Sequence, residues 1–95
     1  IGDGIEKIGN CAFYYCDSLT SVTIGNGVTE IGEMAFYYCY SLEAIYCKPT
    51  TPPSLAAGAF YDIYNTGRIY VPSESIDIYK RSWWNYESRI VGMDI

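Results

Sequence analysis

The chain has 95 residues, a length that allows one small domain. Apolar residues make up 49% of it and charged residues 18%, which supports a folded core and excludes a disordered or membrane-spanning chain. The net charge of -5 repels phosphate backbones and anionic lipid headgroups, and the absence of histidine removes the usual general base and metal ligand. We therefore predict no nucleic-acid binding, no membrane insertion, no cofactor, no metal and no catalysis.

Residues 1–23 are repeated in residues 24–46 without a gap. A degenerate third copy begins to match at an offset of 24, where Ala59-Phe60-Tyr61 repeats Ala35-Phe36-Tyr37. A period of this length is typical of solenoids, in which each coil buries its apolar face on a neighbour. The identical pairs of the first two copies are Ile1/Ile24, Gly2/Gly25, Gly4/Gly27, Ile8/Ile31, Gly9/Gly32, Ala12/Ala35, Phe13/Phe36, Tyr14/Tyr37, Tyr15/Tyr38, Cys16/Cys39, Ser18/Ser41 and Leu19/Leu42.

Each copy is predicted to contain a strand, a tight corner, a second short extended piece and one helical turn. Val22 and Ile24 share the inward face of the strand, which ends at a glycine corner. Val28 and Ile31 then return to the core, and residues 33–37 are predicted to form a helical or 3₁₀ turn.

The period is lost after Pro72. We predict that Ser73 caps a helix running to about residue 82, with Ile76, Tyr79 and Trp83 on one apolar stripe. Residues 90–93 are predicted to form a closing extended segment. A helix that carries Trp83 and Trp84 would cover the open end of the last coil, so residues 73–95 are interpreted as a C-terminal cap.

The repeat resembles the leucine-rich repeat, in particular its bacterial BspA-like subfamily. The residues that carry the resemblance are 19–24 (LTSVTI), 28–32 (VTEIG) and 35–39 (AFYYC). The resemblance covers residues 1–72 and implies a short right-handed α/β solenoid of about three coils with a small helical cap. Gly27 departs from the general pattern, since many leucine-rich families have Asn or Cys at its position.

The resemblance also implies a function. The parent protein would be a bacterial secreted or cell-surface protein, its export signal upstream of this segment, whose repeats mediate adhesion by binding host proteins or other cells. Leucine-rich repeats generally bind ligands on their strand face, so we expect a contact patch of Tyr46, Arg68 and Tyr70, with Ser21 and Thr23 beside it. The alternative is a structural spacer or capping module, with recognition carried by upstream repeats.

Pairs of tyrosines recur with the period, as Tyr14-Tyr15 and Tyr37-Tyr38. We expect one member of each pair to pack between coils and the other to be exposed. The rows are interpreted either as packing between coils or as a weaker contact surface for a protein or a glycan.

The N-terminal coil has no comparable cap. Ile1, Ile5, Ile8 and Phe13 would face an empty neighbouring position, which predicts either preceding coils or self-association through this end.

The four cysteines are Cys11, Cys16, Cys39 and Cys47. Cys16 and Cys39 would stack at equivalent positions, close enough for a bridge but with parallel Cβ vectors that disfavour it. We interpret all four as reduced thiols in small apolar positions.

Overall fold

The computed structural model describes residues 4–61 and 67–93, which form two parallel sheets and a short C-terminal helical region. One sheet has the strand order β1-β3-β5 and the other the order β2-β4-β6-β7. The elements in chain order are β1 (Lys7–Ile8), β2 (Ser21–Ile24), β3 (Glu30–Ile31), β4 (Ala44–Cys47), β5 (Ser54–Leu55), β6 (Arg68–Pro72), the 3₁₀ helix η1 (Ser73–Ser75), α1 (Ile76–Ser82), the 3₁₀ helix η2 (Trp84–Arg89) and β7 (Ile90–Met93).

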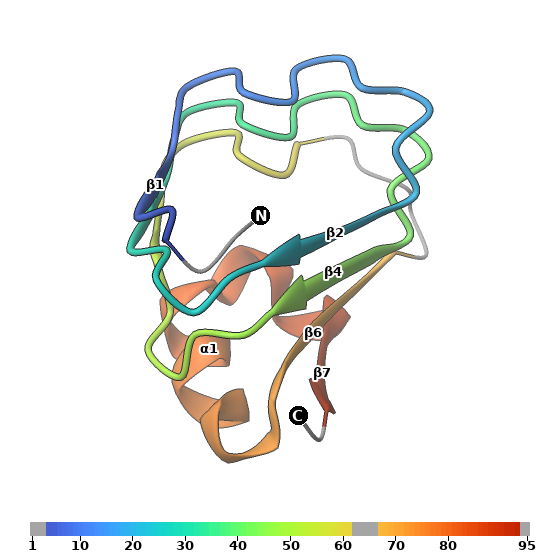
Figure 1. The fold of residues 1–95 in the computed structure, drawn as a ribbon. Helices are drawn as coiled ribbons and strands as arrows, with labels where there is room; N and C mark the ends of the chain where they lie inside the picture. The colour runs from blue at the N-terminus through green and yellow to red at the C-terminus, as the bar shows by residue number, and fades with distance from the viewer. Residues whose placement is uncertain (1–3, 62–66, 94–95) are drawn as a thin grey trace.

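The chain alternates between the two sheets, so the sequence copies stack on one another (Figure 1). We call residues 7–24, 30–47 and 54–72 the first, second and third units. Each unit contributes one strand to each of the two sheets. Ser21 pairs with Ala44, and Ala44 pairs with Arg68, so the register follows the sequence period. Pro49, Pro52 and Pro53 lie between β4 and β5, where the additional residue of the second offset is accommodated.

The core is built from residues that recur at the same position of each unit. Phe13, Phe36 and Phe60 form a row of rings with centroids 5.0 and 5.4 Å apart, and Trp83 follows Phe60 at 5.6 Å. The predicted inward residues of β2 are confirmed, since Val22 and Ile24 are both buried. The row of rings therefore runs through all three units and ends on the C-terminal region.

The predicted helical turn at residues 33–37 is wrong. Met34 and Tyr38 have positive φ values of 53° and 58°, and a left-handed residue cannot continue a right-handed helix. The segment instead forms turns whose N–H groups alternate between local and neighbouring acceptors. The Phe36 N–H, for example, donates to the Ala59 carbonyl of the next unit at 2.7 Å.

The helix after Pro72 is confirmed, but its predicted cap is not. The Ser73 hydroxyl donates to the Met93 carbonyl at 3.0 Å, and α1 begins only at Ile76, after η1. The predicted strand at residues 90–93 is confirmed as β7, which pairs in parallel with β6. Trp83 is buried, whereas Trp84 is 73% exposed, so only the first of the two tryptophans covers the third unit.

Burial decreases toward the first unit. Ala35 and Ala59 are fully buried, whereas Ala12 at the same repeat position is exposed. Ile5 is exposed and Phe13 half-buried, as expected for an open end, but Ile8 is buried, which corrects the prediction for that residue. Ile1, which we expected at the same end, lies outside the described residues. Self-association through the first unit stays a prediction.

Candidate functional site

The outward side chains of β2, β4, β6 and β7 form one continuous surface, which we call the strand face. Register places Thr23, Tyr46, Tyr70 and Val91 in one row across the four strands. A second row contains Ser21, Ala44 and Arg68. All five residues predicted for the contact patch therefore lie together, because in-register parallel strands bring equivalent positions to one face.

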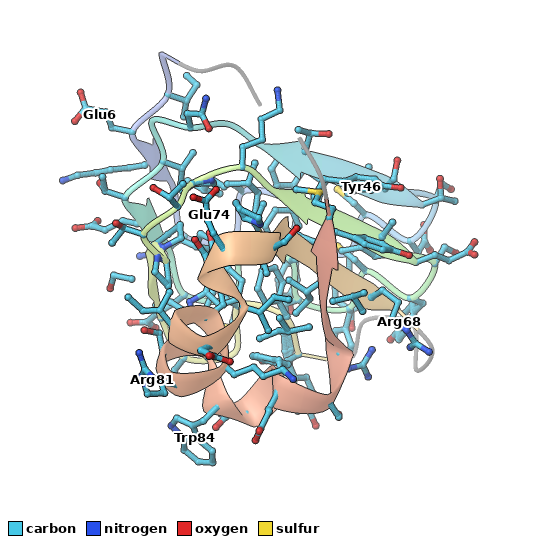
Figure 2. All side chains as sticks on the ribbon, turned by 90° about the horizontal axis from the view of Figure 1, so that it is seen from below. Glu6, Tyr46, Arg68, Glu74, Arg81 and Trp84 are labelled. Atoms are coloured by element: carbon cyan, nitrogen blue, oxygen red, sulfur yellow. The ribbon has the colours of Figure 1, made fainter. Side chains whose placement is uncertain are left out.

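Two tyrosines dominate the strand face. The rings of Tyr46 and Tyr70 are stacked, with centroids 5.1 Å apart and planes inclined by 16°. Tyr46 is 38% exposed and Arg68 is exposed beside it, on the side of the molecule seen at the right of Figure 2. Paired rings on neighbouring strands lose little rotamer freedom on binding, and tyrosine and arginine are favoured contact residues at protein interfaces.

A second set of tyrosines lies on the turns that follow the short strands β1, β3 and β5. We call it the tyrosine surface, and its described members are Tyr14, Tyr15, Tyr37, Tyr38, Tyr40 and Tyr61. Tyr37 lies between Tyr14 and Tyr61, with ring centroids at 5.4 and 5.1 Å, and contacts Tyr38 at 4.1 Å with the planes nearly perpendicular. The rings pack against one another, and those of Tyr14, Tyr15, Tyr40 and Tyr61 are also exposed to solvent.

The expected division of each pair into one packed and one exposed tyrosine is wrong. Tyr14 and Tyr15 are both exposed, and Tyr37 and Tyr38 are both half-buried. Burial depends on the unit and not on the position within the pair, because the first unit lacks a described neighbour on one side. The tyrosine surface is therefore one continuous layer of rings.

Electrostatics within this layer oppose ionisation. A hydrogen bond from the Tyr37 hydroxyl to Tyr38, helped by burial and by the nearby tyrosines, raises the pKa of Tyr37 to about 12. Although Tyr15 is exposed, partial desolvation by its neighbours raises the pKa of its hydroxyl, with a smaller contribution from the charges that Tyr14 and Tyr38 would carry. The hydroxyls of Tyr15 and Tyr37 therefore stay protonated through the physiological pH range.

The four cysteine thiols are all free. Cys39 and Cys47 are buried as predicted, and burial raises the pKa of both thiols, which keeps them in the unreactive protonated form. Cys39 donates a hydrogen bond to the Phe13 carbonyl at 3.1 Å. Cys11 is exposed and Cys16 half-buried, so the prediction of a buried apolar position fails for Cys11.

The described residues offer no cluster of three or more cysteine or acidic side chains that could hold a metal ion. The acidic side chains of the repeat, Asp17, Glu30, Glu33 and Glu43, are exposed. Glu30 pairs with Lys7 at 3.9 Å, a distance at which a solvent-exposed ion pair contributes little to stability.

Sequence reasoning missed one surface feature, the exposed indole of Trp84 beside a pocket of about 160 Å³. A signal for it was present. The stripe of Ile76, Tyr79 and Trp83 defines the inward side of the helix, and the residue that follows Trp83 falls off this stripe.

Comparison with known proteins identifies the repeat. A family model described as a BspA type leucine rich repeat region (6 copies) matches residues 1–92. The search of the curated proteins found no match. Among the residues that the structure describes, no helix has the length and apolar character needed to cross a membrane.

Proposed function

Because the chain belongs to the BspA-type leucine-rich repeat family, we propose that it is an adhesion module that binds another protein through its strand face. The single observation that carries this proposal is the stacked Tyr46–Tyr70 pair, which stands beside Arg68 on a rigid four-stranded sheet. The family suggests protein–protein interaction and is generally non-enzymatic. The proposal adds the site to that general expectation.

The architecture we propose is a right-handed solenoid of about three coils in residues 1–72, closed by a cap in residues 73–95. Parallel strands joined by crossover connections are nearly always right-handed, which supports the hand. The protein is proposed to be a bacterial secreted or surface protein, the location typical of this family, and its ligand a host protein or a protein of another cell.

The proposed mechanism is contact without chemistry. The sheet holds both rings in place before binding, so little conformational entropy is lost when a partner covers them. In a longer array of repeats, equivalent faces would act together and raise avidity without any new type of contact.

The experiment compares adhesion of the protein with that of the double variant Tyr46→Ala/Tyr70→Ala. Labelled protein is added to immobilised extracellular-matrix proteins and to intact animal and bacterial cells. We expect the double variant to bind at least about ten-fold more weakly, because truncation of central aromatic residues removes most of the binding energy of an interface. Tyr61→Ala, an exposed tyrosine outside the strand face, is the matched control and should bind normally.

Three other outcomes would contradict the proposal. If Tyr61→Ala lost adhesion and the double variant did not, the binding site would lie on the tyrosine surface. Adhesion that is equal in all variants would exclude both surfaces. No adhesion by the unaltered protein, together with adhesion by a form extended with further repeats, would establish the alternative of a spacer or capping module.

One observation favours that alternative. The C-terminal region donates side-chain hydrogen bonds to backbone carbonyls between β4 and β5, such as the bond from the Tyr79 hydroxyl to the Pro49 carbonyl at 2.7 Å. Such contacts suit a segment whose purpose is to close a stack of repeats.

A further inference from the structure

The pocket beside Trp84 lies where the C-terminal region meets the third unit. It is lined by residues 55–58 on one side and by residues 82–86, at the junction of α1 and η2, on the other. Every described residue of this lining is uncharged, on a chain whose net charge is -5. We call this feature the cap pocket.

The cap pocket has an aromatic wall held in place by its neighbours. The Trp83 N–H donates to the Tyr79 carbonyl at 2.7 Å, and the Tyr86 N–H donates to the Trp83 carbonyl at 2.9 Å, so the backbone is fixed on both sides of Trp84. Trp83 is buried against the core, whereas the 73% exposed indole of Trp84 projects from the ribbon, away from Tyr46 (Figure 2). Tryptophan is enriched among residues that dominate binding, so this exposed indole on a fixed backbone is a candidate contact residue.

Tyr86 completes this wall. Its ring meets Phe60 edge-on with centroids 5.6 Å apart. Burial raises the pKa of the Tyr86 hydroxyl, an effect opposed by a hydrogen bond from the Phe60 N–H and by the charge of Arg89. Tyr86 is therefore held against the third unit with its hydroxyl protonated.

The opposite wall, formed by residues 55–58, has short side chains in its last three residues and a backbone held by the neighbouring unit. The Met34 N–H donates to the Ala57 carbonyl at 3.2 Å, and Gly58 follows with a positive φ of 70°. Three consecutive small residues, 56–58, line the same pocket as Trp84 and add little side-chain volume to it. The side chains of Ser82 and Asn85 add a hydroxyl and an amide to the same lining, which together supply donors and acceptors.

We propose that the cap pocket binds one neutral hexopyranose ring of a glycan. A sugar ring has an apolar C–H face that packs on an indole and a rim of hydroxyls that both donate and accept hydrogen bonds, which the Trp84 face and the Ser82 and Asn85 side chains match. An uncharged lining provides no counter-charge for a carboxylate or phosphate group. The volume of about 160 Å³ suits a single ring, not an extended chain.

A proline-rich peptide is the main competing ligand, because proline also packs on tryptophan. Its carbonyls require N–H or O–H donors from the aromatic wall. The indole N–H of Trp83 already donates to the Pro53 carbonyl at 3.0 Å and is unavailable for that purpose. The Trp84 indole N–H remains as a donor, and the side chains of Ser82 and Asn85 both donate and accept hydrogen bonds, as sugar hydroxyls do.

Nuclear magnetic resonance tests the proposal directly, because the two tryptophans give two indole N–H signals. The protein is titrated with maltotriose, cellotriose and N-acetylchitotriose to about 20 mM, well above a dissociation constant on the order of 1 mM expected for so small a ligand. We expect at least one trisaccharide to shift the Trp84 indole and Asn85 side-chain amide signals in a saturable manner, with little change at Trp83.

Three variants sharpen the test. Trp84→Ala should lower the affinity at least about ten-fold without unfolding the protein, since the indole is mostly exposed, and Asn85→Ala should lower it less. Tyr46→Ala, which alters only the strand face, should bind the sugar normally even if it abolishes adhesion. Failure of the sugar site and failure of the strand-face proposal are therefore separate results.

The proposal is overturned if none of the three sugars shifts the Trp84 signal, or if Trp84→Ala leaves the affinity unchanged. It is equally overturned if a proline-rich peptide, rather than a sugar, produces the saturable shift. A shift caused only by glucuronic acid would contradict the assignment of a neutral ligand and implicate a charged side chain at the rim.

Discussion

At the residue scale, the repeat depends on backbone conformations that most side chains avoid. Met34 and Gly58 occupy the same repeat position, with φ values of 53° and 70°. A non-glycine residue in this left-handed region is less stable by about 1–2 kcal/mol per residue. The turn geometry is therefore imposed by stacking between units, and the third unit satisfies it with the residue best suited to it.

Replacing Gly58 tests this conclusion. A Cβ at Gly58 would meet only the Met34 Cγ at 3.4 Å, an ordinary contact, so Gly58→Ala should act through the backbone alone. We expect Gly58→Ala to lower the free energy of unfolding by about 1 kcal/mol and Gly58→Asn to lower it less, because asparagine tolerates left-handed φ. Urea unfolding measures both variants. Equal losses for alanine and asparagine would contradict a backbone origin.

The raised pKa of Tyr37 predicts that the protein loses stability as the pH becomes alkaline. The folded-state pKa of about 12 exceeds the ordinary value of 10.0, so the folded protein holds the proton more tightly than the unfolded chain. The contribution is complete below pH 10 and is lost as the pH rises from about 10 to about 12. Absorbance at 295 nm reports ionisation, and thermal melting across the same range should show a smaller decline in Tyr37→Phe than in the unaltered protein.

At the element scale, η1, α1 and Trp83, the residue that follows α1, close the stack of units through side chains that reach backbone carbonyls. The Ser75 hydroxyl donates to the Thr50 carbonyl at 2.8 Å, the Tyr79 hydroxyl to the Pro49 carbonyl and the Trp83 indole to the Pro53 carbonyl. Pro49 and Pro53 are buried, so these two bonds satisfy carbonyls that are shielded from water, whereas Thr50 is exposed. Burial raises the pKa of Tyr79, which keeps its hydroxyl protonated and able to donate.

Tyr79→Phe removes one of these donors and leaves the buried Pro49 carbonyl without it. We expect the free energy of unfolding to fall by about 1–3 kcal/mol, the usual effect of leaving a buried polar group unsatisfied. Tyr61→Phe, which alters an exposed ring, is the control and should change stability by less than about 0.5 kcal/mol. Chemical denaturation followed by circular dichroism distinguishes the two. If Tyr79→Phe left the free energy of unfolding unchanged, the hydrogen bond would not contribute to the attachment of the C-terminal region.

At the scale of the whole molecule, a single core runs through the three units and is completed unequally at its two ends. Phe36 and Phe60 are buried, and Trp83 covers the third unit, whereas Phe13 is half-buried. The same residue type therefore contributes less burial in the first unit than in the second. Stability should decrease toward the first unit, as in other quasi-one-dimensional repeat folds.

The equivalent alanines of the first two units provide a matched pair. Ala35→Arg places a charge in a fully buried position between units and should destabilise the protein by more than about 4 kcal/mol or prevent folding. Ala12→Arg places the same charge at an exposed position and should change stability by less than about 0.5 kcal/mol. Similar losses in the two variants, measured by urea unfolding, would contradict the unequal burial of the units.

Much of the fold and of the strand face could be predicted from the sequence, because residues at equivalent positions of the repeat lie next to one another when the units stack. When Val22 aligns with Ile45 and Thr23 with Tyr46, in-register strands place the first pair inside and the second outside. The patch around Tyr46, Arg68 and Tyr70 follows from the same argument. Its geometry is confirmed, and its role in binding stays a prediction.

The sequence by itself therefore determined the period, the register, the residues of the strand face and the location of the C-terminal helix. Only the tertiary structure decided the left-handed turns at Met34 and Tyr38, the exposure of Ala12 and the pocket beside Trp84. Periodicity reports which residues share a face, because that property is local to a strand or turn. The strained turns, the exposure of residues in the first unit and the shape of the pocket depend on which neighbour each unit packs against. Only the packed structure shows those neighbours.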